Sequence, residues 1–161
     1  MHVRLAVAGD AEAVADIWNN EVLNSTHVFE LVPRSTNAQE RWLAEHAGAH
    51  PAVVAVDGSL VLGFASLSPY HSRPAYAGSV EDSVYVGSEH RAQGVGRALL
   101  EEVVRLAGAH GFHTVIARIA DHNQPSVSLH RSAGFDLVGV EHEVGRKFGR
   151  WLDVAIMQLM L

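Results

Sequence analysis

The sequence predicts an α/β (α+β) domain built on one central mixed sheet. Three observations support this class: apolar runs of strand and helix periodicity alternate along the chain, turn signals separate them, and 161 residues suit one domain. Apolar residues make up 48% of the chain and charged residues 19%, as in chains that bury a core. We therefore expect a single domain over residues 1–161, in the order strand, two helices, three strands, helix, strand, helix and two strands.

Capping and turn signals divide the first half of the chain. Asp10 is a candidate helix N-cap, and Thr36 with Gln39 three residues later has the capping-box pattern of a second helix. Asp57 followed by Gly58 is a strong hairpin signal. The strands expected in this half are 3–7, 52–56, 60–67 and 80–86, with loops at 24–33 and 68–78.

The second half is divided by glycines. The helical run from Arg97 to His110 has apolar residues at helical spacing, and Gly111 suits its C-terminal cap. A short helix over 123–133 has Pro125 in its first turn and ends at Gly134. The remaining strands are expected at 114–119, 135–140 and 151–161, the last two joined by a connection rich in Gly, Arg and Lys.

Composition and charge exclude several classes of function. Without cysteine the chain has no disulfide, thiolate metal site or cysteine nucleophile, which fits a cytoplasmic protein. A net charge of −6 with only 12 Lys and Arg residues argues against a nucleic-acid partner. No apolar run reaches the roughly 20 residues that span a bilayer, and the N-terminus lacks a signal-peptide pattern, so we expect no membrane partner. We expect no metal, because successive side chains of the Glu-His-Glu run at 141–143 point to opposite faces of a strand and so cannot converge on one ion.

The most informative segment is a glycine turn between a strand and a helix. It comprises Arg91, Ala92, Gln93, Gly94, Val95, Gly96 and Arg97. The first N–H groups of a helix have no internal partner, and the helix dipole adds positive charge there, so such a turn suits a phosphate or pyrophosphate. Glycines let the backbone approach the ligand, and arginines add charge-assisted contacts. The turn therefore predicts a phosphorylated cofactor.

Further blocks make this pattern more specific. Arg91-x-x-Gly94-x-Gly96 between a strand and a helix resembles the acyl-CoA signature of the GNAT N-acetyltransferases, and the element order is similar over essentially the whole chain. The segments 81–86, 123–135 and 147–153 resemble the phosphinothricin and methionine sulfoximine/sulfone N-acetyltransferases of that superfamily. The resemblance implies a GNAT-like domain with a mixed, mostly antiparallel sheet flanked by about four helices. It also implies acetyl transfer from acetyl-CoA, as co-substrate, to the α-amino group of a small amino acid.

The resemblance also assigns roles to individual residues. For binding acetyl-CoA it implies the glycine turn, the strand backbone before it and a later helix: Val84, Tyr85, Val86, Arg91 to Arg97, Asn123, Ser126 and Ser132. For binding the acceptor it implies a loop and the strand after it: His71, Ser72, Arg73, Glu81, Asp82 and Ser83. At the reaction centre it implies Glu81 beside the acceptor amine and His130 close by.

Two adjacent carboxylates, Glu81 and Asp82, are candidates for the general base, and the direction of each side chain distinguishes them. Glu81 and Asp82 point to opposite faces of a strand, so only one can serve a given pocket. Glu81 shares its face with Ser83 and Tyr85, and we choose it as the general base on that direction and on the resemblance. Without a cysteine or a Gly-x-Ser-x-Gly elbow, we expect direct attack of the amine on the thioester within a ternary complex.

Other functions stay open at this point. One is a GNAT enzyme for a polyamine, an aminoglycoside or a protein N-terminus, although Arg73 and His71 favour an acceptor with an acidic group. Another is a non-catalytic acetyl-CoA sensor, against which the presence of Glu81 argues. His130 is either catalytic or a histidine packed on the sheet. The apolar segment 154–161 and the family resemblance favour a homodimer.

Overall fold

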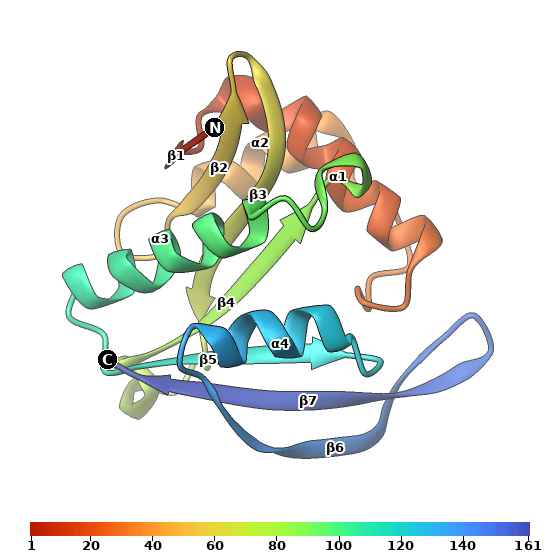
Figure 1. Ribbon diagram of the computed structural model, residues 1–161, viewed down its shortest axis with the longest axis vertical. Helices are drawn as coiled ribbons and strands as arrows, with labels where there is room; N and C mark the ends of the chain where they lie inside the picture. The colour runs from red at the N-terminus through yellow and green to blue at the C-terminus, as the bar shows by residue number, and fades with distance from the viewer.

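The computed structural model describes residues 1–161 and contains one seven-stranded sheet (Figure 1). The strands lie in the order β1-β2-β3-β4-β5-β7-β6. Their bounds are β1 His2–Leu5, β2 Ala52–Asp57, β3 Leu60–Pro69, β4 Ser79–Val86, β5 Thr114–Ala120, β6 Asp136–Lys147 and β7 Arg150–Met160. Only β4 and β5 pair in parallel, and every other pair is antiparallel. The predicted fold class and the mixed, mostly antiparallel sheet are confirmed.

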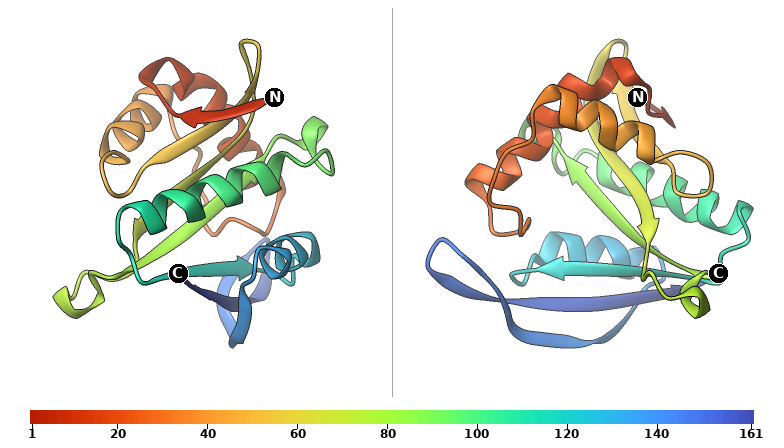
Figure 2. Two further views of the ribbon diagram at one scale, coloured as in Figure 1. Left: turned by 60° about the vertical axis from the view of Figure 1, so that its left-hand side comes forward. Right: turned by 180° about the vertical axis from the view of Figure 1, so that it is seen from behind.

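Four α-helices cover both faces of the sheet. They are α1 Ala11–Asn24, α2 Thr36–Glu45, α3 Val95–Ala109 and α4 Gln124–Ser132. In Figure 1, α3 and α4 lie in front of the sheet, and the right-hand view of Figure 2 shows α1 and α2 on the other face. Leu99 and Val103 of α3 belong to the larger buried cluster, whereas Trp18 of α1 packs with Phe64 of β3 in a second one. None of these helices has the length and apolar character needed to cross a bilayer.

The feature of the sheet that matters for the site is the separation of β4 from β5. The two strands pair only over Ser79–Asp82 and Thr114–Ala117, and beyond these residues they diverge, as Figure 1 shows. The stretch Ser83–Val86 keeps its pairing with β3 but has no strand on its other side. Alternate N–H and C=O groups of this stretch therefore face a space in which a ligand can bind them.

Both early helix starts differ in detail from the expected caps. Asp10 is the N-cap residue of α1, as expected, but its carboxylate caps no N–H of that helix. It accepts hydrogen bonds instead from the Arg4 guanidinium at 2.7 and 2.8 Å and from the Val7 N–H at 2.8 Å. The N-cap of α2 is Ser35 and not Thr36. A guanidinium held in two hydrogen bonds is a stronger partner for a carboxylate than an exposed helix N–H.

The expected connection before the last strand is also different. β6 continues to Lys147, and only Phe148 and Gly149, with φ of 51° and 73°, form the turn to β7. The pairing of β6 with β7 is irregular between residues 137 and 139 and between 141 and 145. Such irregularities interrupt the alternation of inward and outward side chains, which is why this strand reads as a loop in the sequence.

Candidate active site

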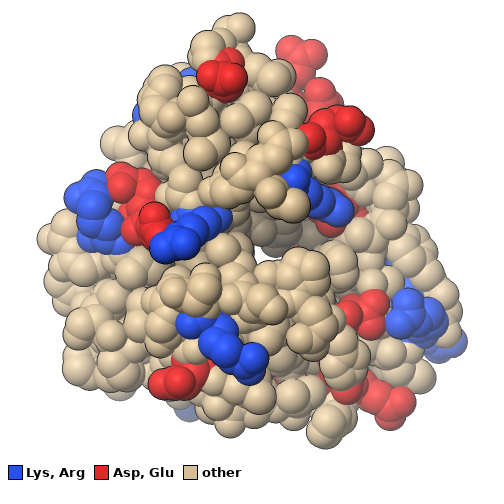
Figure 3. All heavy atoms as spheres, in the orientation of Figure 1, with Lys and Arg blue, Asp and Glu red and all other residues tan.

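A cavity of about 520 Å³ lies where β4 and β5 separate. Its walls come from β4, β5, α4 and the start of α3, so segments far apart in the sequence meet there. The space-filling view in Figure 3 shows an opening at the centre of this face, with Lys or Arg atoms on both sides of it. We call this space the fork cavity.

Most of the predicted cofactor-binding residues line the fork cavity. They are Val84, Tyr85, Val86, Arg91, Ala92, Gly94, Gly96, Arg97, Asn123 and Ser126. Three others do not line it. The side chain of Gln93 donates to the Glu89 carbonyl, Val95 is buried in the core, and the Ser132 hydroxyl donates to the Leu129 carbonyl.

The glycine turn brings the start of α3 to the cavity wall. Gly94 precedes the helix with φ of 83°, a left-handed conformation that glycine adopts without a steric penalty. A side chain at Gly96 would place its Cβ 3.3 Å from Leu129 Cδ2 and 3.5 Å from Val86 Cγ2. Gly94 therefore sets the backbone direction, and Gly96 lets α3 start close against α4 and β4.

The two arginines of the turn already have carboxylate partners. Arg91 forms an ion pair with Glu21 of α1, whose side chain is buried and also lines the fork cavity. Arg97 pairs with Glu101 one turn along α3, at 2.7 Å, and both of these side chains are exposed. The positive charge at the turn is thus held in place by carboxylates of α1 and α3.

His130 and Asp82 form a buried pair in the wall of the fork cavity. His130 Nε2 lies 2.9 Å from Asp82 Oδ2, and their side chains are only 4% and 1% exposed. The other ring nitrogen, Nδ1, lies 2.8 Å from the carbonyl oxygen of Ser126. Burial lowers the pKa of His130, but its hydrogen bond with Asp82, the charge of Asp82 and the Ser126 carbonyl together raise that pKa above its ordinary value. Since both ring nitrogens face acceptors, the imidazolium form satisfies both.

Glu81 faces the other side of β4, as the alternation of strand side chains requires. There a second cavity of about 280 Å³, which we call the Glu81 cavity, lies between the sheet, α1, α2 and the loop that joins these helices. Burial raises the pKa of Glu81, and the charge of Arg118 only partly offsets this. Ser83 and Tyr85 line both cavities, so the two spaces adjoin across β4.

The Glu81 cavity contains residues to which the sequence reasoning gave no binding role. They are Trp18, Glu30, Arg34, Trp42, Ser66 and Ser68. The signal available in the sequence was an arginine in the loop between two helices that each carry an inward-facing tryptophan. By contrast, His71, Ser72 and Arg73 lie in an exposed loop outside both cavities, where the His71 ring stacks on Tyr76 with centroids 5.0 Å apart.

The hairpin of β6 and β7 supports the α1–α2 loop. Lys147 is buried and its Nζ donates to the carbonyl oxygen of Val28 at 2.7 Å. The ring of Phe29 lies directly over Gly145, where an added Cβ would come within 2.3 Å of it. Since this loop also supplies Arg34 to the Glu81 cavity, the hairpin holds part of that cavity in position.

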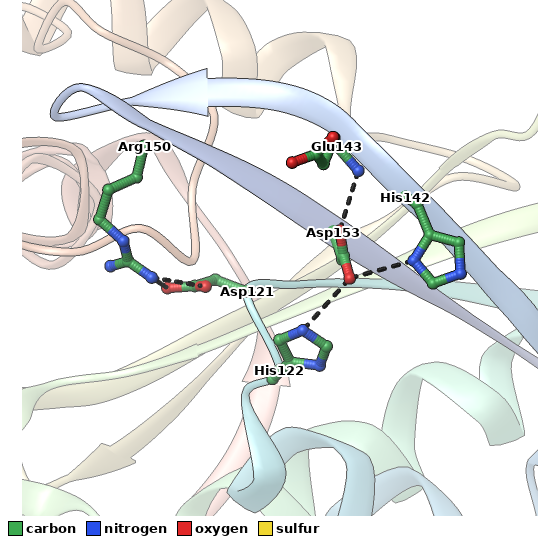
Figure 4. A network of polar contacts seen from close by, with 6 residues as sticks. All are labelled: Asp121, His122, His142, Glu143, Arg150 and Asp153. Atoms are coloured by element: carbon green, nitrogen blue, oxygen red, sulfur yellow. Dashed lines mark hydrogen bonds and ion pairs between the residues drawn. The ribbon is translucent and has the colours of Figure 1, made fainter.

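Polar contacts also link the hairpin to the turn between β5 and α4 (Figure 4). Asp153 of β7 accepts a hydrogen bond from the Glu143 N–H at 2.8 Å, and His122 and His142 lie 3.3 and 3.2 Å from its Oδ2. Arg150 pairs with Asp121 at 3.2 Å. No group of three or more His, Asp or Glu side chains is arranged to hold a metal ion.

The chain is similar to known acetyltransferases over its whole length. A model of the acetyltransferase (GNAT) family matches residues 14–135. The L-methionine sulfoximine/L-methionine sulfone acetyltransferase of Pseudomonas aeruginosa is 37% identical over 161 residues, covering 99% of this chain and 94% of that protein. A phosphinothricin acetyltransferase from Sinorhizobium meliloti, solved in complex with AcCoA, has a TM-score of 0.95 and 40% identity, covering 99% of this chain and 87% of its own. A ribosomal-protein-alanine N-acetyltransferase from Brucella melitensis has a TM-score of 0.97 and 36% identity over 100% of both chains. The chain belongs to the GNAT acetyltransferase family.

Proposed function

We propose that the protein transfers the acetyl group of acetyl-CoA to the α-amino group of a small amino acid such as phosphinothricin, methionine sulfoximine or methionine sulfone. The observation that carries this proposal is the pair of adjoining cavities, with the glycine turn beside one and Glu81 in the other. Names of relatives support the acceptor class, since similar proteins are named for these amino acids. In this proposal the two substrates occupy separate cavities, whose walls have Ser83 and Tyr85 in common.

The fork cavity suits acetyl-CoA in its shape and in its donor groups. The free backbone edge of Ser83–Val86 can pair with the amides of a pantetheine arm, and the start of α3 offers unpaired N–H groups to a pyrophosphate. Asn123 and Ser126 stand on the opposite wall. When bound, acetyl-CoA supplies an activated acetyl group as a thioester.

In the proposed mechanism Glu81 acts as the general base. An amino-acid amine is protonated at neutral pH and must lose a proton before it can attack a carbonyl carbon. The raised pKa of Glu81 makes it a better proton acceptor than an ordinary carboxylate. The amine then attacks the thioester carbonyl directly, and a free N–H on the edge of β4 stabilises the developing oxyanion.

His130 has a different part in this proposal. Its two ring nitrogens are engaged with Asp82 and with the carbonyl of Ser126, so we assign it as a positioning residue that holds α4 against β4. The Ser126 hydroxyl lines the fork cavity and can donate a hydrogen bond to the departing thiolate, which then takes its proton from solvent. Burial raises the pKa of Tyr85, so its hydroxyl stays protonated and is a weaker acid than an ordinary tyrosine.

A protein N-terminus is the second candidate acceptor. The solved structure named as a ribosomal-protein-alanine N-acetyltransferase has the same fold over the whole chain. A peptide N-terminus offers an α-amine without an adjacent free carboxylate. The charge of the Glu81 cavity, with Arg34 beside two glutamates, suits a free amino acid better than a polycation or a peptide.

A thiol-release assay with acetyl-CoA tests the function. The panel contains methionine sulfone, methionine sulfoximine, phosphinothricin, methionine, spermidine and an alanine-initiated peptide. We expect CoA release with the free amino acids. Release only with spermidine or the peptide would identify another acetyltransferase, and binding of acetyl-CoA without release for any acceptor would identify a sensor.

We also propose that two copies associate through β6 and β7. Several large apolar side chains on these strands and at their ends are exposed: Leu137, Val138, Val140, Val144, Phe148, Trp151, Met160 and Leu161. β6 is an edge strand, which leaves one row of its backbone groups unpaired. Sedimentation at micromolar concentration tests this, and a monomer alone would contradict it.

A further inference from the structure

Arg34 is the one cationic side chain in the wall of the Glu81 cavity. Because the proposed function places the acceptor in this cavity, we infer that Arg34 binds the α-carboxylate of the acceptor and thereby selects amino acids over simple amines. The inference rests on that proposed function and adds a specificity-determining residue to it. It also moves the recognition of the acidic group away from the exposed loop that contains Arg73.

The main chain of Arg34 is held firmly by α1. The Asn19 side chain accepts a hydrogen bond from the Arg34 N–H at 2.8 Å and donates one to the Arg34 carbonyl at 2.8 Å. The next residue, Ser35, caps α2 by accepting a hydrogen bond from the Ala38 N–H at 3.2 Å. A residue fixed on both sides in this way presents its side chain with little loss of entropy on binding.

The guanidinium of Arg34 lies close to two aromatic rings and has no carboxylate partner. Its central carbon is 4.1 Å from the centre of the Trp18 ring and 5.4 Å from that of Trp42. Its only side-chain hydrogen bond reaches Gln39 Oε1 at 3.4 Å, and no carboxylate oxygen lies within the 4.0 Å of an ion pair. Partial burial also lowers the pKa of Arg34. A partly buried cation with free donors gains stability when an anion binds it.

The charges in this cavity match those of an amino acid. Glu81 and Glu30 supply negative charge for the ammonium group, and Arg34 supplies positive charge for a carboxylate. In methionine sulfone the sulfone is neutral, so the α-carboxylate is its only anionic group. The planar fork of the guanidinium binds carboxylates in a bidentate manner, which a lysine does not reproduce.

The test compares two acceptors that differ only in the carboxylate: methionine sulfone and the amine that it yields on decarboxylation. For Arg34→Gln we expect kcat/KM with methionine sulfone to fall about 10- to 100-fold, mainly through KM, as for loss of a charged hydrogen-bonded pair. With the decarboxylated amine, kcat/KM should change less than about twofold. Arg34→Lys keeps the charge without the fork and should lie between these values. Equal losses with both acceptors would assign Arg34 a purely structural role and overturn the inference.

Two further variants complete the experiment. Arg41→Gln removes an exposed arginine of α2 that makes no ion pair, and it should leave both acceptors unaffected. Arg73→Gln tests the rival loop, and a loss there with no loss in Arg34→Gln would contradict the inference. Calorimetric binding of methionine sulfone to the enzyme with CoA needs no turnover. If binding of methionine sulfone depends on Arg34 but no acetyl transfer occurs, the proposed function fails and the role of Arg34 in binding the carboxylate stands. If acetyl transfer occurs and Arg34→Gln leaves its kcat/KM unchanged, the proposed function stands and the role of Arg34 fails.

Discussion

His130 Nε2 lies 2.9 Å from Asp82 Oδ2, inside the protein and on the face of β4 opposite Glu81. Asp82 is also the last residue of β4 that pairs with β5. The contact therefore ties α4 to the sheet at the point where the two strands separate and the fork cavity begins. The neighbouring carboxylates of Asp82 and Glu81 thus have different environments, because Asp82 faces His130 and Glu81 faces an open cavity.

Asp82→Asn should lower the pKa of His130. Without the carboxylate, only the hydrogen bond with the Ser126 carbonyl still opposes the lowering effect of burial on this pKa. In the wild type the pKa of His130 is higher in the folded state than in the unfolded state, so the charged imidazolium stabilises the fold. This stabilisation is complete below the unfolded-state pKa of about 6.5 and is lost as the pH rises through the folded-state pKa. The variant should therefore be less stable by about 1–3 kcal/mol at acidic pH, with a smaller difference at alkaline pH. Titration of the His130 ring by NMR and denaturant unfolding at several pH values measure both effects.

The matched control for this prediction is Asp136→Asn at the exposed start of β6. It should leave the His130 titration unchanged. A stability difference for Asp82→Asn that does not vary with pH would contradict the charged pair.

Glu81→Gln should abolish most of the turnover while acetyl-CoA binding is retained. Loss of a general base typically lowers kcat by about 10²–10⁴-fold. Because burial raises the pKa of Glu81, ionised Glu81 lowers stability at neutral pH, and the variant should be as stable as the wild type or more so. For the same reason, wild-type activity should fall on acidification at a pH above the ordinary glutamate value of about 4.3. Steady-state kinetics across pH and thermal unfolding measure these effects.

Glu40→Gln, which changes an exposed carboxylate of α2, is the control. It should leave kcat unchanged. Turnover of Glu81→Gln close to that of the wild type from about pH 6 to 9 would remove Glu81 from the mechanism.

The parts of the site that the sequence predicted are those set by local structure. Gly94 requires a left-handed backbone, and the strand before it and the helix after it have clear periodicity. The turn, its strand and its helix could therefore be read within one short segment. The directions of Glu81 and Asp82 followed from strand alternation alone, and they agree with the two cavities.

The parts that the sequence did not predict depend on contacts between distant segments. The pair of His130 and Asp82 spans 48 residues, and no local pattern indicates which acidic residue a helix histidine will meet. Arg34 becomes part of the site because its guanidinium lies close to the rings of both Trp18 and Trp42, which are on different helices. Helical spacing can place both tryptophans on the inward faces of their helices, but it does not distinguish a core position from a cavity wall.

Lys147→Met should loosen the α1–α2 loop. The ammonium group is buried and donates to the carbonyl of Val28, so the variant loses a charged hydrogen bond worth about 1.5–3 kcal/mol. We expect a similar fall in the free energy of unfolding, faster hydrogen exchange over residues 25–34 and a higher KM for the acceptor. Arg146→Met, one residue earlier and exposed, is the control. Unchanged exchange of this loop in Lys147→Met would show that the hairpin does not hold it.

Gly94→Val should cause a large loss of acetyl-CoA affinity and only a modest loss in the free energy of unfolding. Gly94 has φ of 83°, which a β-branched residue adopts only with strain, so the free N–H groups at the start of α3 would turn away from the fork cavity. Gly48→Val is a matched control, because Gly48 also has a positive φ, 63°, and open space around it, but is in the loop before β2 and does not line this cavity. Both variants should lose about 1 kcal/mol or more of stability. Calorimetry should then show a large loss of acetyl-CoA affinity for Gly94→Val alone, and equal affinities in the two variants would contradict the assignment of this turn to the pyrophosphate.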